Sequence, residues 1–232
     1  MKLQGKKVVV TGGSSGIGQA IARRCAEAGA DVLITYRSNR KGAEETAREL
    51  AGSGRRIEIV QTNIAQEPDI AALAREARAR LGRVDVWINN AGADILTGEG
   101  GRLTPLEKLD LLLAVDVRGT VMASWAAAGL MREQGGSGVI INMSWDHVGH
   151  GMAGENPALY ATAKGAVLSF SKSFAREVAP DIRVNILAPG FIETAFGEDA
   201  DPRFRREVVE RTPLGRWGTP DDVAAAALFL AS

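Results

Sequence analysis

The chain has 232 residues, 45% of them hydrophobic and 24% charged, which is enough to bury the core of one domain covering residues 1–232. Its 28 basic residues balance its 28 acidic ones, so no overall charge attracts nucleic acid or an anionic membrane, and we expect neither as a partner. No apolar run is long enough to cross a bilayer, no secretion signal precedes the first strand-like residues, and the single Cys25 can form no internal disulfide, so we expect a cytoplasmic protein.

A strand, a glycine-rich turn and a helix are predicted in succession at the start of the chain. Residues 7–10 are a β-branched run, residues 11–18 read TGGSSGIG, and residues 19–28 are amphipathic. Glycines let the backbone approach a pyrophosphate closely, and free N–H groups at the start of a helix bind the anion. Because Gly29 ends the helix and residues 31–36 supply a second strand, the full βαβ context of a dinucleotide site is present. The alternative is a turn with only a structural role.

The end of the second strand indicates which dinucleotide binds. NAD sites usually carry an acidic residue there to bind the ribose hydroxyls, and the segment YRSNRK at residues 36–41 has none. Arg37 is placed to pair with a 2′-phosphate, so the sequence favours NADP as the cofactor, with NAD as the alternative. These residues could instead be solvated and simply open the next helix.

Helices and strands continue to alternate, which predicts a parallel sheet. Helices are expected at residues 41–50 and 68–81, and strands at residues 57–61 and 84–88. The predicted fold class is therefore α/β, a single-domain doubly wound Rossmann-type parallel sheet with helices on both faces. The segment NNAG at residues 89–92 follows the fourth strand at its carboxyl end, where ligands bind in open α/β sheets.

A phenol and an amine share one face of a predicted helix in the second half of the chain. The helix is expected to begin with Asn156 as its N-cap and Pro157 in its first turn, and to run towards Pro180. Tyr160 and Lys164 lie four residues apart, which places them on one face. Lys164 would stabilise the phenolate and lower the pKa of Tyr160 from about 10 towards a range useful for proton transfer. The same spacing also arises by chance.

These motifs, taken in order, resemble those of the short-chain dehydrogenase/reductase family along nearly the whole chain. The resemblance rests on the glycine turn at 11–18, NNAG at 89–92, the pair Tyr160 and Lys164, and the segment APGFIET at 188–194. Residues 35–39 and 213–220 are similar to the 3-oxoacyl-carrier-protein reductase and glucose dehydrogenase subgroup. The resemblance implies an enzyme that interconverts a carbonyl and a secondary alcohol on a small-molecule or acyl-chain substrate. It also implies a homo-oligomer, a tetramer or a dimer.

The resemblance also implies roles for individual residues. Tyr160 would exchange a proton with the substrate oxygen, and Lys164 would lower the pKa of Tyr160 and hold the nicotinamide ribose, while the hydride chemistry belongs to the cofactor. The implied cofactor contacts are Gly12, Ser14, Ser15, Gly16, Ile17, Gly18, Tyr36, Arg37, Asn63, Ile64, Asn90, Ala91, Gly92, Tyr160, Lys164, Pro189, Gly190, Ile192 and Thr194.

Trp145 stands where the family carries its supporting serine. An indole N–H donates a hydrogen bond but cannot accept one, and its bulk would reshape the substrate cavity. Ser144 or Asp146 would have to take the role of that serine, which requires a shift of the backbone. The segment at residues 146–156 is lengthened, and this permits such a shift. Ser144 is therefore a candidate catalytic residue.

Asp116 stands where the family usually carries an asparagine. It lies in a long helix expected at residues 104–131, which opens with Pro105 and a capping box from Thr104 to Glu107. As an anion near Lys164, Asp116 could hold the water of a proton relay, so it is also a candidate catalytic residue. The alternative is that Asp116 satisfies the helix backbone or pairs with Arg118.

These two replacements motivate a second hypothesis for the function. The chain could bind the cofactor with weak or no catalysis, as a redox sensor or as the partner of an active subunit. The chain keeps Tyr160 and Lys164 at the spacing of the family's catalytic pair, and this favours an active enzyme instead.

Three further segments complete the sequence-based expectations. No metal is expected from Asp146, His147, His150 and Glu155, because their spacing matches no known metal-binding pattern. Residues 191–211 are expected to form a flap over the substrate, whose apolar members Phe191, Ile192, Ala195 and Phe196 line the pocket or pack the flap. Relatives continue into a final edge strand that this sequence lacks, so an exposed edge is expected beside the strand at residues 183–187.

Overall fold

A computed structural model describes residues 2–198 and 200–232 of the chain, except for the side chains of Phe196 and Glu198. The described residues contain one sheet of six parallel strands in the order β3-β2-β1-β4-β5-β6. This order confirms the doubly wound Rossmann-type fold. The strands are β1 (Lys7–Val10), β2 (Asp31–Tyr36), β3 (Ile57–Gln61), β4 (Val86–Asn89), β5 (Gly138–Met143) and β6 (Ile182–Leu187), with β3 and β6 at the edges.

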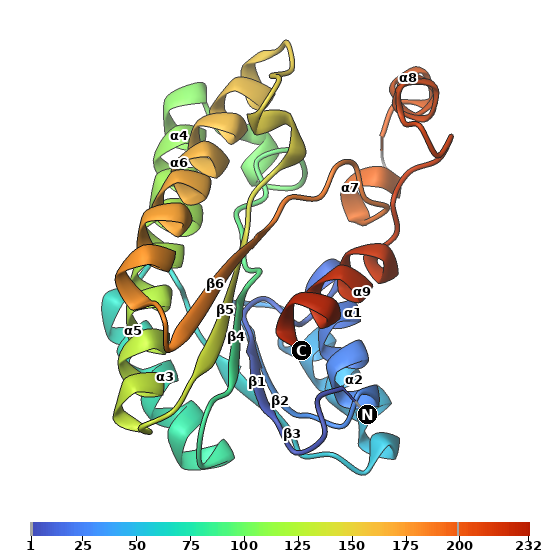
Figure 1. The fold of residues 1–232 in the computed structure, drawn as a ribbon. Coiled ribbons are helices and arrows are strands. Elements are labelled where there is room, and N and C mark those ends of the chain that lie inside the picture. The colour runs from blue at the N-terminus through green and yellow to red at the C-terminus, as the bar shows by residue number, and fades with distance from the viewer. Residues whose placement is uncertain (1, 199) are drawn as a thin grey trace.

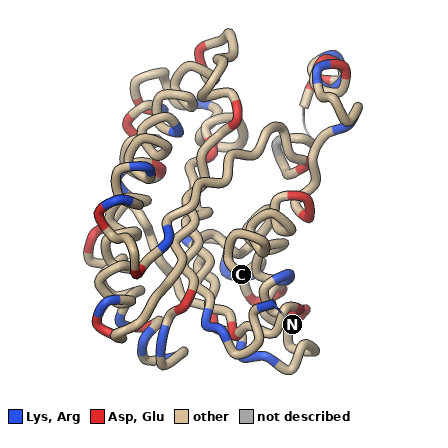
Figure 2. The backbone as a smooth tube through the Cα atoms, viewed as in Figure 1, with Lys and Arg blue, Asp and Glu red and all other residues tan. Residues whose placement is uncertain are grey.

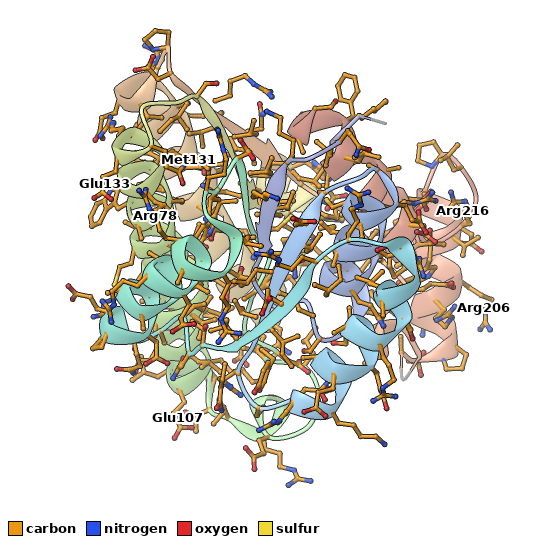
Figure 3. The ribbon with its side chains drawn as sticks, turned by 90° about the horizontal axis from the view of Figure 1, so that it is seen from below. Arg78, Glu107, Met131, Glu133, Arg206 and Arg216 are labelled. Carbon is orange, nitrogen blue, oxygen red and sulfur yellow. The ribbon has the colours of Figure 1, made fainter. Side chains whose placement is uncertain are left out.

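Helices cover both faces of the sheet (Figure 1). One face carries α1 (Gly16–Glu27), α2 (Arg40–Leu50) and α9 (Pro220–Ala231), and the other carries α3 (Glu67–Leu81), α4 (Pro105–Leu112), α5 (Thr120–Glu133) and α6 (Glu155–Val178). Figure 3 shows the two sides from below, with Arg78 and Glu133 on one and Arg206 and Arg216 on the other. The short helices α7 (Ala195–Glu198) and α8 (Pro202–Arg211) follow β6 in the expected flap.

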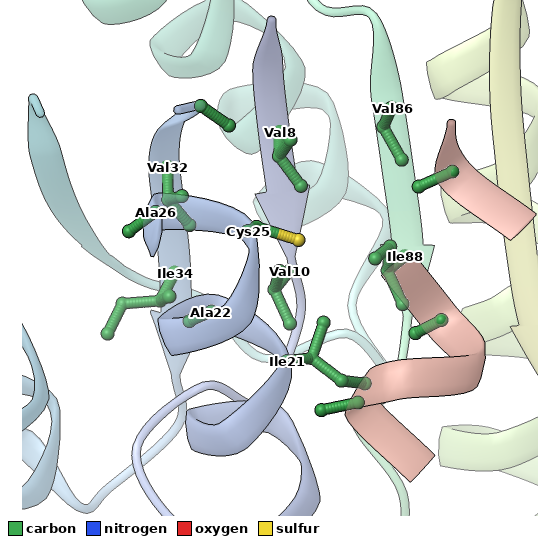
Figure 4. Packing of buried hydrophobic residues seen from close by; sticks show 14 of the residues in the cluster. Val8, Val10, Ile21, Ala22, Cys25, Ala26, Val32, Ile34, Val86 and Ile88 are labelled. Atoms are coloured by element: carbon green, nitrogen blue, oxygen red, sulfur yellow. The ribbon is translucent and has the colours of Figure 1, made fainter. Parts of the chain in front are cut away.

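The core consists of the two faces of the sheet and the helix surfaces packed on them. Val8 and Val10 of β1 are fully buried against Ile21 and Cys25 of α1 (Figure 4). Cys25 is therefore a packing residue, and burial raises the pKa of its thiol to about 12. Burial on both faces explains why these strands read as continuous apolar runs.

The long helix beside the sheet is continuous but not uniform. Its capping box is confirmed, since Thr104 accepts from the Glu107 N–H and Glu107 accepts from the Thr104 N–H. Between α4 and α5 the helix widens into a π segment, η3 (Leu113–Gly119). Such insertions occur mostly as short bulges and often at functional sites.

The same helix corrects the expectation that nothing in the chain could span a membrane. Pro105–Glu133 is long and apolar enough to do so by length and composition, and it is the one such helix among the described residues. In the fold, 50% of its most apolar 18-residue window is buried, and α5 packs against α3, β4 and β5. A core helix of this kind passes the same test, so the finding is weak evidence for a membrane. Figure 2 shows Lys and Arg interspersed with Asp and Glu over the outer helices.

Candidate active site

The glycine turn is tied to the end of β4 by a compact set of hydrogen bonds. Thr11 Oγ1 accepts from the N–H groups of Asn90 and Ala91, both at 3.0 Å. Asn90 Nδ2 donates in return to the carbonyls of Thr11 (3.0 Å) and Gly12 (3.1 Å). A Cβ at Gly18 would lie 2.1 Å from the Gly12 carbonyl oxygen, so only glycine fits there. The two predicted motifs therefore form one unit at the carboxyl edge of the sheet.

The first turn of α1 fits an anion such as a pyrophosphate. The helix begins at Gly16, whose φ of +54° is a conformation that glycine adopts readily. Its N-cap, Ser15, makes no side-chain capping bond, and the first backbone N–H groups of a helix have no partner within the helix. Ser14 and Ser15 lie in the turn itself, while Ile17 lies on the wall of a cavity.

The segment after β2 leaves one arginine available for a ligand. Tyr36 is buried in the core, and Arg37 is exposed with no ion pair among the residues that the structure describes. The neighbouring Arg40 bonds to Glu44 at 2.7 Å, and Asn39 caps α2 by accepting from the Gly42 N–H at 3.0 Å. The segment thus does open a helix, as the alternative held, but Arg37 takes no part in it.

Asn63 and Ile64, two of the expected cofactor contacts, lie after β3. Asn63 Oδ1 accepts from the Ala65 N–H at 3.1 Å, and the Asn63 N–H donates to Asp69 at 2.8 Å. Ile64 is buried, and a Cβ at Gly119 would lie 3.2 Å from its side chain. Both residues are held in place by the protein itself.

Tyr160 and Lys164 lie on α6, as the spacing predicts. The helix starts at Glu155 after Gly154, whose φ is +127°, so the expected N-cap role of Asn156 is wrong. Asn156 Oδ1 accepts from Lys108 Nζ at 3.0 Å instead. Lys164 Nζ lies 5.3 Å from the centre of the Tyr160 ring.

Lys164 is held by a buried ion pair. Its Nζ lies 2.7 Å from Asp116 Oδ1, and it also donates to the Met143 carbonyl at 3.3 Å. Asp116 Oδ2 accepts from the Ala93 N–H at 2.9 Å. The alternative partner, Arg118, donates to the Ala65 carbonyl at 3.3 Å instead. The π segment therefore joins the loop after β4 to the amine of α6.

This ion pair changes the expected electrostatics of Tyr160. Burial, the largest influence, raises the pKa of Tyr160, while Lys164 lowers it and Asp116 raises it again. Lys164 therefore lowers the pKa of Tyr160 as expected, but burial and Asp116 outweigh Lys164, so the pKa lies above its ordinary value and the expected net shift to a lower pKa is wrong. Burial also opposes the charge of Lys164, but Asp116 and Tyr160 outweigh burial and raise the pKa of Lys164.

Ser144 and Asp146, the two candidates for the role of the missing serine, each bond to another protein group. Ser144 Oγ donates to the Lys164 carbonyl at 2.9 Å, and a hydroxyl has only one hydrogen to donate. Asp146 Oδ1 bonds to His147 Nδ1 at 2.5 Å. Trp145 is buried, and its ring meets the Tyr160 ring edge-on at 5.3 Å between centres. An indole thus occupies the position beside the phenol.

A cavity of about 650 Å³ brings most of the predicted site together. Of the predicted site residues, the glycine turn contributes Ile17, the loop after β4 contributes Asn90 and Gly92, and the second half of the chain contributes Ser144, Tyr160, Lys164, Pro189, Gly190, Ile192 and Thr194. Phe191 also lines it, as one alternative for the flap held, whereas the side chain of Phe196 lies outside the described set. The rest of the glycine turn does not line this cavity, and neither do Tyr36, Arg37, Asn63 and Ile64.

Several cavity residues were missed from the sequence. Met152, Asn156 and Phe204 line it, as do Asp94 and Asp201. Asn156 carried a usable signal, since it precedes Tyr160 by four residues on the same helix, and Asp201 and Phe204 lie within the flap expected at residues 191–211. In the described part of the chain, no three His, Cys, Asp or Glu side chains cluster as a metal site would require.

Comparisons with known proteins identify the family and support the fold. The sequence profile of a family described as Enoyl-(Acyl carrier protein) reductase matches residues 12–232. The chain is 35% identical to 3beta-hydroxysteroid dehydrogenase 1 of Eggerthella lenta, over 99% of this chain and 88% of that protein. It is also 35% identical to a 3-oxoacyl-(acyl-carrier-protein) reductase of Chlamydia pneumoniae, over 99% of this chain and 91% of that protein. The crystal structure of a short chain dehydrogenase from Burkholderia cenocepacia in complex with NADP matches with a TM-score of 0.88 and 34% identity, covering 100% of this chain and 92% of that one.

Proposed function

We propose, because this chain belongs to the short-chain dehydrogenase/reductase family, that it uses NADP to interconvert a carbonyl and a secondary alcohol on a small-molecule or acyl-chain substrate. As a member of that family it is an NAD(P)-dependent oxidoreductase. The observation that carries the proposal is a single cavity lined by Ile17 of the glycine turn and by Tyr160 and Lys164. A cofactor on the turn and a substrate at Tyr160 would therefore share one cavity.

Tyr160 would exchange a proton with the substrate oxygen. Its raised pKa keeps it protonated at neutral pH, which suits it to donate a proton to the oxygen of a carbonyl that is being reduced. Lys164, charged and fixed by Asp116, would hold the nicotinamide ribose and favour the phenolate that remains. Bound NADP would supply or accept the hydride. Asp116 would be a positioning residue, and Ser144 would fix the backbone of α6 beside Lys164.

The turn and its surroundings would bind the rest of the cofactor. Gly12, Gly16 and Gly18 give room for the pyrophosphate. Arg37, which forms no ion pair with any side chain that the structure describes, offers a cation for a 2′-phosphate. The NADP bound to the Burkholderia relative supports the same choice. The remaining contacts are proposed from the family resemblance at Ser14, Ser15, Ile17, Tyr36, Asn63, Ile64, Asn90, Ala91, Gly92, Pro189, Gly190, Ile192 and Thr194.

Arg37→Asp is expected to reverse the cofactor preference. Loss of a charge-assisted contact worth about 1.5–3 kcal/mol would weaken NADPH binding by roughly 10- to 150-fold, while NADH binding improves or holds. Fluorescence titration of both reduced cofactors measures the change. Arg48→Asp makes the same charge change at the far end of α2, where Arg48 is exposed, and serves as the control. An unchanged preference in Arg37→Asp would remove Arg37 from the phosphate site.

A second candidate function is cofactor binding with little or no catalysis. Two observations favour it: Trp145 lies beside Tyr160, and the Asp116 carboxylate offsets the charge of Lys164. NADPH binding by titration, without oxidation of NADPH by any of a broad panel of carbonyl compounds, would select this function over the first.

The assembly and location of the protein are proposed on weaker grounds. We expect a single cytoplasmic domain that forms a dimer or tetramer, as the resemblance implies. The long helix presents exposed apolar side chains, Leu106 and Trp125, of the kind that subunit contacts bury. Light scattering of the purified protein measures the assembly.

A further inference from the structure

The first turn of α6 places a second polar side chain beside Tyr160. Asn156 precedes Tyr160 by four residues, so the two lie on one face of the helix, about 6 Å apart along its axis. Both line the cavity. A molecule whose reacting oxygen is at Tyr160 therefore has Asn156 within reach of its far end.

A buried lysine fixes which way the Asn156 amide faces. Lys108 is only 7% exposed, and its Nζ donates to Asn156 Oδ1 at 3.0 Å. An ammonium can only donate hydrogen bonds, so the amide oxygen must face Lys108 and the Nδ2 group must face away from it. Among the side chains that the structure describes, which exclude Phe196 and Glu198, no acidic group pairs with Lys108 and no group accepts from Asn156 Nδ2. The amide thus holds a donor ready for a ligand.

The cavity also has a wall of aromatic rings. Trp145 lies 5.3 Å from the Tyr160 ring and 6.4 Å from the Phe191 ring, and Phe191 lies 5.2 Å from Phe204, between ring centres. All four residues line the cavity. Ring surfaces of this kind pack well against a flat, apolar ring system.

We propose that Asn156, oriented by Lys108, is a specificity-determining residue that donates from Nδ2 to a second oxygen of a ring-containing ketone. This inference rests on the proposed function, in which the reacting carbonyl lies at Tyr160. The aromatic wall binds the rings, and Asn156 selects those that carry a hydrogen-bond acceptor at the end remote from the reacting carbon. Lys108 acts only through Asn156 and is a positioning residue.

The test compares fused two-ring ketones that differ by one oxygen. The probes are 2-decalone and the two diketones 2,6- and 2,7-decalindione, bound to the NADP⁺-loaded protein and read by tryptophan fluorescence. A ketone oxygen can only accept, so Asp94 and Asp201, also on the cavity wall, cannot bond to it. One hydrogen bond worth about 0.5–1.5 kcal/mol should make one diketone bind roughly 2- to 12-fold more tightly than 2-decalone.

Variants assign this preference to the Asn156 amide. Asn156→Ala should abolish it, and Lys108→Met should reduce it although Lys108 does not line the cavity. Asn156→Asp keeps the shape and gains an ion pair with Lys108, so it should fold and disfavour the diketone. Met152→Ala, another cavity residue, should change the binding of all probes alike.

Two results would overturn the inference: equal binding of all probes by the unaltered protein, or a preference that survives in both Asn156 variants. Oxidation of NADPH by the same ketones is measured in parallel. A preference without oxidation of NADPH, either by these ketones or by the broad panel of carbonyl compounds, would contradict the proposed function and leave the role of Asn156 standing. Oxidation of NADPH without a preference would do the reverse.

Discussion

Tyr160→Phe is expected to lower turnover by about 10²–10⁴-fold, the usual contribution of a positioned general acid or base. The substitution removes only the hydroxyl, so the ring keeps its edge-on contact with Trp145 and its place beside Lys164. Without the hydroxyl no proton reaches the substrate oxygen from this position. The measurement is the rate of NADPH oxidation with any ketone that the unaltered protein reduces.

The effect should be confined to the chemical step. NADPH affinity should change little, because the ammonium of Lys164 and the glycine turn remain in place. Thr162→Ala changes a hydroxyl on an exposed position of the same helix, where Thr162 bonds only to the Ala158 carbonyl, and should leave the rate close to that of the unaltered protein. Full activity in Tyr160→Phe would end the assignment of Tyr160 as the acid and base.

Asp116→Asn should have the second largest effect, on both stability and pH dependence. Asp116 and Lys164 are 1% and 4% exposed, and removing one partner of such a buried ion pair costs about 3–5 kcal/mol. The pKa of Lys164 is raised in the folded protein, so this stability is fully present below the ordinary lysine pKa of 10.5 and is lost as the pH rises through the raised value. Urea unfolding at pH 7 measures the loss.

The same variant should move the pH profile of alcohol oxidation. Tyr160 would then act as a base, so the rate rises with pH towards the pKa of Tyr160. Because the Asp116 carboxylate raises that pKa, its replacement by a neutral amide should shift the rise to lower pH. Asp110→Asn, at an exposed position of α4, is the control and should shift neither stability nor profile. An unchanged profile in Asp116→Asn would mean that the ion pair does not control Tyr160.

Much of the fold could be predicted from local patterns. The strands at 7–10, 31–36 and 57–61 have the predicted bounds, because β-branched and apolar residues between turn signals favour strands whatever surrounds them. The first residues of the helices were predicted less accurately, as α6 shows. At α6 the glycine before Glu155 ends the preceding loop, and Lys108 takes the Asn156 oxygen that would otherwise cap the helix.

The sequence by itself determined the parts of the site that depend on spacing along one element. The helical period puts Tyr160 and Lys164 on one face of α6, and the glycines of residues 11–18 specify a turn open to an anion. Only the tertiary structure decided what these groups meet. Asp116 reaches Lys164 because the π segment packs on α6, and Lys108 orients Asn156 from another helix. The direction of the Tyr160 pKa shift likewise comes from burial and from a charge far away in the sequence, because the cost of a buried charge depends on its whole surroundings in the fold.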